Sequence, residues 1–165
     1  MGLGLLGGGV TVAQTFVEVG SQVTVTDLKN ETALKSSLDQ LAGLPIKFVL
    51  GKHQEADFTS PDVIIRNPAI PEASPFLKLA TDHGIPIKME TALFAKYTDA
   101  TLIGITGTRG KTTTATLIFE IIESVHKPVV LAGNIPGQAT LSLLKTISAD
   151  TLVVLELSSW QLQGF

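Results

Sequence analysis

The sequence has no cysteine, few aromatic residues and no long run of charged or apolar residues. Without cysteine, a disulfide framework, thiolate chemistry and a cysteine metal site are all excluded. The net charge is −3 and there is no basic tract, so the electrostatic footprint of a nucleic-acid-binding protein is missing. No apolar stretch is long enough to cross a bilayer, and the apolar opening lacks the basic start of a signal peptide. We therefore expect a cytoplasmic protein that binds neither nucleic acid nor membrane.

The chain of 165 residues is 44% hydrophobic, enough for one compact domain or two small ones. Short apolar runs of β-type residues alternate with segments of helical periodicity. This alternation predicts an α/β fold with mostly parallel sheets. We place a boundary in the segment Tyr97 to Ala100 and predict two domains, residues 1–98 and 99–165.

The most informative stretch runs from Gly104 to Thr113, between an apolar β-type run and an amphipathic helical segment. Strand, glycine-rich turn, Lys-Thr and helix is the layout of a phosphate-binding loop, in which backbone N–H groups and the helix N-terminus face the phosphates. Lys111 would reach the β- and γ-phosphates, and the Thr112 hydroxyl would bind Mg²⁺. The strict pattern is not met, because Ile105 stands where its first glycine is expected. The alternative is a glycine-rich turn that only joins strand to helix.

A second glycine loop opens the chain, where residues 2–7 match the pattern Gly-x-Gly-x-x-Gly. Asp27 follows Gly7 by 20 residues, the place of the acid at the end of the second strand of a Rossmann-type unit. The strand that should precede this loop is absent, so we expect a Rossmann-like domain without its first strand. The loop would accept a uridine diphosphate or NAD equally well. The alternative is a glycine turn packed for close helix–strand contact, with Asp27 in solvent.

Polar residues also follow three later apolar runs. A loop at Asn67 to Pro71 follows the expected strand 62–66, and ligands bind at such strand ends in open α/β sheets. The expected strand 128–132 leads into Gly133 and Asn134, and then into a helix with Ala139, Leu143 and Leu144 facing inward. The run 151–155 is continuously apolar, as in a parallel strand buried on both faces, and ends at Glu156. A carboxylate beside a phosphate loop is well placed for Mg²⁺, whereas the alternative is an acid in solvent.

Together these motifs resemble the Mur ligases of peptidoglycan synthesis. Gly104 to Thr113 is similar to the ATP loop of that family, with Arg109 in place of its asparagine. Gly133 to Ile135 is similar to its Gly-Asn-Ile-Gly turn, with Pro136 in place of the last glycine. The segment Leu155 to Leu162 resembles Leu-Glu-Leu-Ser-Ser-Phe-Gln-Leu of the member that adds D-glutamate. The opening loop, Asp27 and Asn67 to Ile70 fit the uridine-binding domain. The resemblance implies a Rossmann-like domain followed by the first part of a P-loop-type ATP-binding domain.

The resemblance also implies a role for each of the quoted residues. Those that would hold ATP are Gly107, Thr108, Arg109, Gly110, Lys111, Thr112 and Thr113. Those that would hold the UDP part of the substrate are Leu5, Leu6, Gly7, Asp27, Leu28, Lys29, Asn67, Pro68 and Ala69. Those toward the muramoyl-alanine end are Asn134, Ser158 and Gln161. The implied metal ligands are Thr112 and Glu156, and the implied catalytic residues are Lys111, Asn134 and Glu156.

The chemistry implied by the resemblance is ATP-driven amide formation through an acyl phosphate, with Mg²⁺, UDP-N-acetylmuramoyl-L-alanine and D-glutamate as small-molecule partners of a monomer. The family's central domain continues past Phe165 and a third domain follows, so we expect a fragment that is truncated at both ends and inactive alone. Three alternatives stay open: a nucleotide-binding module without ligase activity, an NAD-linked protein, and another Mur or folylpolyglutamate-synthase-like ligase.

Overall fold

A computed structural model covers residues 1–165 and describes all of them except 6 and 136–138. The chain forms two compact units, Met1–Glu90 (unit 1) and Thr91–Phe165 (unit 2). The predicted domain division at 98/99 stays a prediction. Both units combine helices with all-parallel sheets, which confirms the predicted α/β class.

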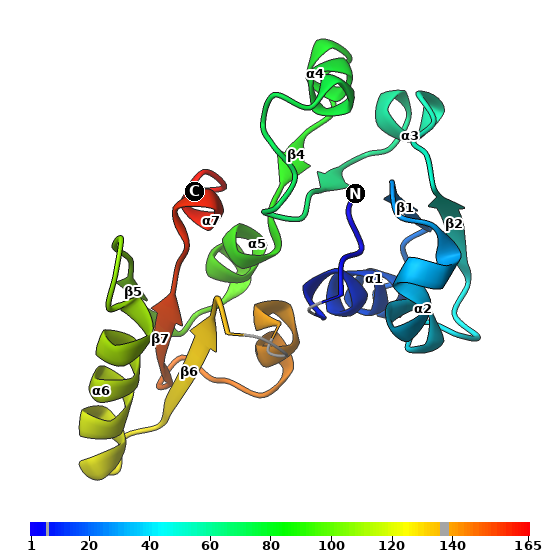
Figure 1. The fold of residues 1–165 in the computed structure, drawn as a ribbon. Helices are drawn as coiled ribbons and strands as arrows, with labels where there is room; N and C mark the ends of the chain where they lie inside the picture. The colour runs from blue at the N-terminus through cyan, green and yellow to red at the C-terminus, as the bar shows by residue number, and fades with distance from the viewer. Residues whose placement is uncertain (6, 136–138) are drawn as a thin grey trace. The chain divides into compact units, whose positions relative to one another are not determined.

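Unit 1 contains two parallel two-stranded sheets, β1–β2 and β3–β4, with a helix before or between the strands (Figure 1). Its elements are α1 (Gly8–Glu18), β1 (Val23–Asp27), α2 (Glu31–Asp39), β2 (Ile46–Leu50), α3 (Ala56–Thr59), β3 (Ile64–Ile65), α4 (Pro75–Asp82) and β4 (Ile87–Lys88). The sequence pattern missed α3, because its four residues are too few to show helical periodicity.

Local sequence signals explain where the longer helices of unit 1 begin. The Asn30 side chain accepts a hydrogen bond from Ala33 N at 3.0 Å, which caps α2. Pro75 occupies the first turn of α4, where its missing N–H costs nothing. Both helices then bury an apolar stripe, with Leu34 of α2 and Leu77 of α4 almost wholly inaccessible to solvent.

Two apolar clusters hold unit 1 together. The first joins α1, β1 and α2, and its buried members are Leu3, Val10, Ala13, Val25, Leu34 and Leu41. The second joins α3, β3 and α4, and its buried members are Phe58, Ile64, Leu77 and Ala80. The ring of His53 packs edge-on against Phe58 and Phe76 beside this second cluster, and its Nδ1 lies 2.6 Å from Thr26 Oγ1.

Unit 2 is built around a three-stranded parallel sheet in the order β5–β7–β6, with α6 packed against all three strands (Figure 1). Its elements are α5 (Glu90–Tyr97), β5 (Thr101–Ile105), α6 (Lys111–Ser124), β6 (Val129–Gly133), η1 (Thr140–Lys145), β7 (Leu152–Glu156) and α7 (Ser159–Leu162). Val153 and Val154 of the central strand are fully buried, as their continuously apolar run predicts.

The helix expected after Gly137 is a 3₁₀ helix, and its predicted inward face is wrong. Thr140 and Leu141 are the buried residues, whereas Ala139, Leu143 and Leu144 are half-buried. A 3₁₀ helix has three residues per turn, so the α-helical spacing used for the prediction selects the wrong side chains.

The amino group of Met1 makes the stability of the 165-residue chain depend on pH. It is buried and donates to Ile65 O at 2.8 Å. Burial lowers the pKa of this amine from 8.0 to about 6, against a smaller opposing effect of Asp27. Burial also lowers the pKa of His53, with a further lowering by the same amine and an opposing effect of Asp27 and Asp57.

Both groups therefore take up protons more readily in the unfolded chain. As the pH falls from 8 toward 6 the unfolded state binds the extra proton, and the free energy of unfolding of unit 1 decreases by on the order of 2 kcal/mol. We expect urea unfolding at pH 8 and pH 6 to show this decrease. Nα-acetylation removes the amine and should leave only the His53 contribution, which appears near and below pH 6.5. An unchanged slope in the acetylated chain would contradict the assignment.

Candidate functional site

The carboxyl ends of the three strands of unit 2 meet at one edge of the sheet. Glu156, the last residue of β7, is in register with Ile105 of β5 and with Gly133 of β6. The predicted phosphate loop directly follows Ile105, and Asn134 directly follows Gly133. The parallel register therefore brings three segments that are distant along the chain to the same edge of the sheet: the start of the predicted phosphate loop, Asn134 and Glu156.

The predicted phosphate loop ends at α6, whose N-cap residue is Gly110. Gly110 has φ +76° and Gly107 has φ +151°, a backbone that residues with a side chain rarely adopt. Lys111 Nζ donates to Gly107 O at 2.9 Å, so the lysine side chain folds back and bridges the loop. Thr108, Arg109, Thr112 and Thr113 are exposed, and their assignment to ATP stays a prediction.

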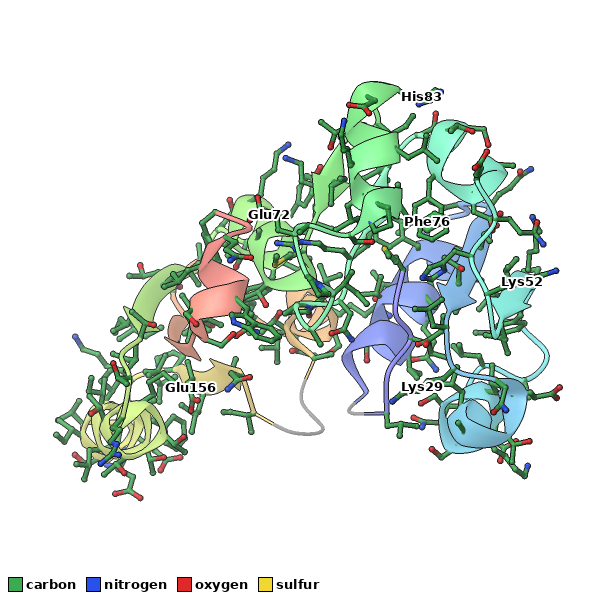
Figure 2. The ribbon with its side chains drawn as sticks, turned by 45° about the horizontal axis from the view of Figure 1, so that its top comes forward. Lys29, Lys52, Glu72, Phe76, His83 and Glu156 are labelled. Atoms are coloured by element: carbon green, nitrogen blue, oxygen red, sulfur yellow. The ribbon has the colours of Figure 1, made fainter. Side chains whose placement is uncertain are left out.

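Glu156 is the buried charged residue of this edge, with 3% of its surface exposed (Figure 2). Its Oε1 accepts a hydrogen bond from Asn134 Nδ2 at 3.2 Å, and its backbone carbonyl accepts one from Asn134 N at 2.8 Å. A buried carboxylate needs a partner or a cation. In the part of the chain that the structure describes, the Asn134 amide is the one side-chain donor to Glu156, which leaves acceptor capacity for a metal ion. Among the described residues no three His, Cys, Asp or Glu side chains gather as a metal site, so any Mg²⁺ here would use Glu156 with hydroxyl, phosphate or water oxygens.

Ser158 and Gln161 form a capping box at the start of α7. Ser158 Oγ accepts from Gln161 N at 3.2 Å, and Gln161 Oε1 accepts from Ser158 N at 2.8 Å. Gln161 Nε2 also donates to Thr91 Oγ1 at 3.2 Å, and both side chains are buried. These bonds hold the turn that follows Glu156. Sequence reasoning missed Thr91, because it precedes Gln161 by 70 residues and belongs to no motif.

In unit 1 the structure brings the opening loop, Asp27 and the Asn67 loop together. Asp27 Oδ2 accepts from Gly4 N at 3.3 Å, and Asp27 Oδ1 accepts from Lys29 N at 2.9 Å. A Cβ atom on Gly2 or Gly4 would lie 3.0–3.1 Å from the Asn67 side chain, so the two loops are in close contact. The Asp27 carboxylate is buried, and through these bonds it holds the opening loop beside the end of β1. The alternative of an acid in solvent is therefore wrong.

The other predicted UDP-site residues frame this edge. Leu5 and Leu28 are exposed at 49% and 65%, and the Lys29 side chain is exposed (Figure 2). Gly7 is the N-cap of α1 with φ +88°. Pro68 is half-buried, and Ala69 N donates to Asn67 Oδ1 at 3.0 Å. Leu6 lies outside the described residues. The assignment of these residues to UDP stays a prediction.

The fold and these two loop edges define the class: an α/β protein with parallel sheets and a glycine-rich loop at the strand ends of each unit. The chain belongs to the Mur ligase family. Residues 1–89 match the N-terminal domain of MurD-like Mur ligases, and residues 105–164 match the Mur ligase middle domain.

Curated relatives carry the name UDP-N-acetylmuramoylalanine–D-glutamate ligase. The protein of Roseiflexus sp. (strain RS-1) is 46% identical over 164 residues, which cover 99% of this chain and 35% of the relative. That of Trichlorobacter lovleyi is 40% identical over 161 residues, which cover 98% and 36%. The chain thus spans about a third of the length of these relatives.

Among solved structures, a pseudomurein peptide ligase type C from Methanothermus fervidus aligns with a TM-score of 0.48 and 25% identity. The alignment covers 92% of this chain and 30% of that one. No helix in the described part of the chain is long and apolar enough to span a membrane.

Proposed function

We propose that the chain carries the UDP-binding and ATP-loop parts of a cytoplasmic, monomeric, ATP-dependent ligase that joins D-glutamate to UDP-N-acetylmuramoyl-L-alanine in peptidoglycan synthesis. Membership of the Mur ligase family and the names of the relatives support this proposal. The observation that carries it is the buried Glu156 carboxylate, held by Asn134 at the strand end in register with the start of the glycine loop.

The residues at the strand ends of unit 2 fit a nucleoside triphosphate with Mg²⁺. The positive φ angles of Gly107 and Gly110 let backbone N–H groups face phosphate oxygens, and the first turn of α6 contains no acidic residue to repel them. Thr112 and Glu156 would hold Mg²⁺, and the bound ion would neutralise charge on the phosphates. Lys111 would exchange its carbonyl partner, Gly107 O, for a phosphate oxygen, a stronger charge-assisted bond.

In the proposed reaction, the carboxylate of the muramoyl-alanine substrate attacks the γ-phosphorus of ATP and ADP leaves. The amine of D-glutamate then attacks the acyl phosphate, and inorganic phosphate leaves as the amide bond forms. Lys111 would stabilise the charge on the transferred phosphoryl group, and Asn134 would hold the Glu156 carboxylate in place. We propose that the 165-residue chain does not ligate alone, and an assay that finds ATP- and D-glutamate-dependent product would contradict this.

Thermal melting with separate ligands tests the binding part of the proposal. Mg-ATP and UDP-N-acetylmuramoyl-L-alanine should each raise the melting temperature, since a ligand at a hundredfold excess over Kd contributes about 2.7 kcal/mol. A shift with NAD and none with the uridine compound would support the NAD-linked alternative. If both proposed ligands raise the melting temperature, melting does not separate a ligase from a nucleotide-binding module without ligase activity, and only an assay for the ligated product can do so.

Lys111→Ala should lower the affinity for Mg-ATP at least about tenfold, because a charge-assisted bond to phosphate contributes about 1.5–3 kcal/mol. The shift with the uridine compound should persist. Lys127→Ala is the matched control, since this exposed lysine follows α6 and lies outside the predicted loop. Equal loss of the Mg-ATP shift in both variants would indicate a general charge effect and contradict the assignment of Lys111.

A further inference from the structure

The loop that follows β2 lies against the turn that follows β1. The two strands are parallel and their last residues are in register, so both segments leave the sheet at the same edge (Figure 1). Gly51 N donates to Lys29 O at 3.0 Å, and His53 Nδ1 lies 2.6 Å from Thr26 Oγ1. The loop therefore contacts the turn at two points, one before and one after Asp27 in the chain.

The hydroxyl group of Thr26 is buried, with 4% of the residue's surface exposed. Side chains alternate between the two faces of a strand, and Val25 belongs to the first apolar cluster, so Thr26 points to the opposite face. Within the described residues, His53 is the one side-chain partner of this hydroxyl. A buried hydroxyl without a partner costs free energy, so loss of the imidazole would free the Thr26 side chain to turn toward another partner.

The imidazole of His53 is itself held by two aromatic rings. The rings of Phe58 and Phe76 contact it edge-on, with centroids 5.3 and 4.9 Å away and interplanar angles of 75° and 73°. Phe58 is wholly buried in the second apolar cluster, and Phe76 packs against that cluster. Edge-to-face contact is an arrangement that aromatic rings prefer, and it restricts how the imidazole can turn. Through this ring, the end of β1 is tied to the second apolar cluster.

The turn after β1 is also bonded to the opening glycine loop. Asp27 Oδ1 accepts from Lys29 N at 2.9 Å, and Asp27 Oδ2 accepts from Gly4 N at 3.3 Å. The carboxylate therefore joins the turn to the loop. Thr26 directly precedes Asp27, so the placement of this carboxylate depends on how Thr26 is held.

We propose that His53 is a positioning residue of the predicted UDP site: by bonding Thr26, it holds the turn from Asp27 to Lys29 in the conformation that receives the uridine nucleotide. The bond of Gly51 N to Lys29 O supports the same turn from its other end. This role rests on the proposed function, which assigns the turn to UDP. It belongs to a residue that is part of none of the sequence motifs.

A small set of variants separates the hydrogen bond from the packing of the ring. His53→Phe keeps a ring against Phe58 and Phe76 but removes the polar atom, whereas His53→Asn keeps a polar atom near the place of Nδ1 but loses the ring. Thr26→Val removes the hydroxyl at nearly constant shape, alone or together with His53→Phe. His83→Phe is the matched control, since this exposed histidine bonds the carbonyl of a residue in its own helix (Figure 2). At pH 8 the imidazole of His53 is neutral, because burial lowers its pKa, so the variants do not differ in charge.

Calorimetric titration with UDP at pH 8 gives the affinity of each form. We expect His53→Phe and Thr26→Val to bind UDP about fivefold more weakly than the unchanged chain, an effect of the size that one hydrogen bond supplies. The double variant should lose no more than either single variant, because all three lack the same bond. His53→Asn should bind UDP within about twofold of the unchanged chain but melt at a lower temperature, because it keeps the polar atom and loses the ring contacts. Without UDP, the Lys29 amide should exchange with solvent on the order of tenfold faster in His53→Phe than in the unchanged chain.

Equal affinity for UDP in His53→Phe and in an unchanged chain that binds UDP would overturn the proposal. An equal loss of affinity in His83→Phe would also overturn it, as a general effect of removing a histidine. So would a loss in His53→Asn as large as that in His53→Phe, because the packing of the ring would then explain the result. An unchanged chain that binds no UDP would instead overturn the proposed function, and this role with it, so the two failures give different results.

Discussion

Gly9→Ala is expected to destabilise unit 1 by about 3 kcal/mol, whereas Gly8→Ala, one residue earlier in the same helix, is expected to stabilise it slightly. A Cβ on Gly9 would lie 2.1 Å from Leu3 O, and the carbon atoms of that peptide would be within 2.9 Å. A Cβ on Gly8 meets nothing within 4 Å. Both residues belong to the first turn of α1.

The two effects have different physical origins. Leu3 cannot move away easily, because its side chain is buried in the first apolar cluster and the backbone of its neighbour Gly2 is hydrogen-bonded to Thr26 O. The alanine methyl group must therefore push α1 away from the opening loop, and overpacking of this kind costs about 1–3 kcal/mol or more when the neighbour is backbone. At Gly8 the substitution only restricts the unfolded chain and improves helix propensity, a gain of up to about 1 kcal/mol.

Urea unfolding of the two variants beside the unchanged chain is the measurement. Opposite signs for neighbouring glycines would be difficult to explain by helix propensity, which favours alanine at both positions. If Gly9→Ala were as stable as Gly8→Ala, the close approach of Leu3 to α1 would be wrong, and the arrangement of the opening loop with it.

Gly133→Ala is expected to destabilise unit 2 by about 4 kcal/mol and to abolish the stabilising effect of Mg-ATP. Gly133 has φ +104°, which strains any residue with a side chain by about 1–2 kcal/mol. Its Cβ would also lie 2.1 Å from the carbonyl oxygen of Glu156, its register partner in β7. Relief of that clash must separate β6 from β7 where Asn134 binds Glu156, which adds a cost of about 3 kcal/mol.

Gly110→Ala is the matched control for backbone strain. Gly110 has φ +76° and a Cβ there meets nothing within 4 Å, so the variant should lose only about 1–2 kcal/mol. The difference in the free energy of unfolding between the two variants measures the contact between Gly133 and Glu156. Equal losses would show that the strands do not approach as closely as the structure indicates at this edge.

Much of the fold could be predicted, because its signals are local. The run 151–155 is apolar without interruption, and it forms a buried central strand of a parallel sheet. The glycine-rich segment predicted as a phosphate loop lies at the expected junction of strand and helix, between β5 and α6. The 3₁₀ helix at Thr140–Lys145 was beyond this reasoning, because apolar spacing alone does not separate three residues per turn from 3.6.

The candidate site could be predicted only as a set of separate motifs. Polar residues after each apolar run identify Asn134 and Glu156, but not the hydrogen bond between them, which depends on the register of β6 with β7. The same holds for Asp27, which was predicted at the end of its strand but whose bonds to Gly4 N and Lys29 N follow from the packing of the loops.

By itself, the sequence determined the α/β class, the alternation of strands with the longer helices and the positions of both glycine loops. Helical and strand periodicity, glycine conformation and capping act over a few neighbouring residues, so local sequence is enough to show them. Tertiary structure alone decided which atoms meet. The hydrogen bond of Gln161 to Thr91 spans 70 positions, and the backbone hydrogen bond of Met1 to Ile65 spans 64. Such contacts depend on how strands from distant segments align, and no local pattern encodes that alignment.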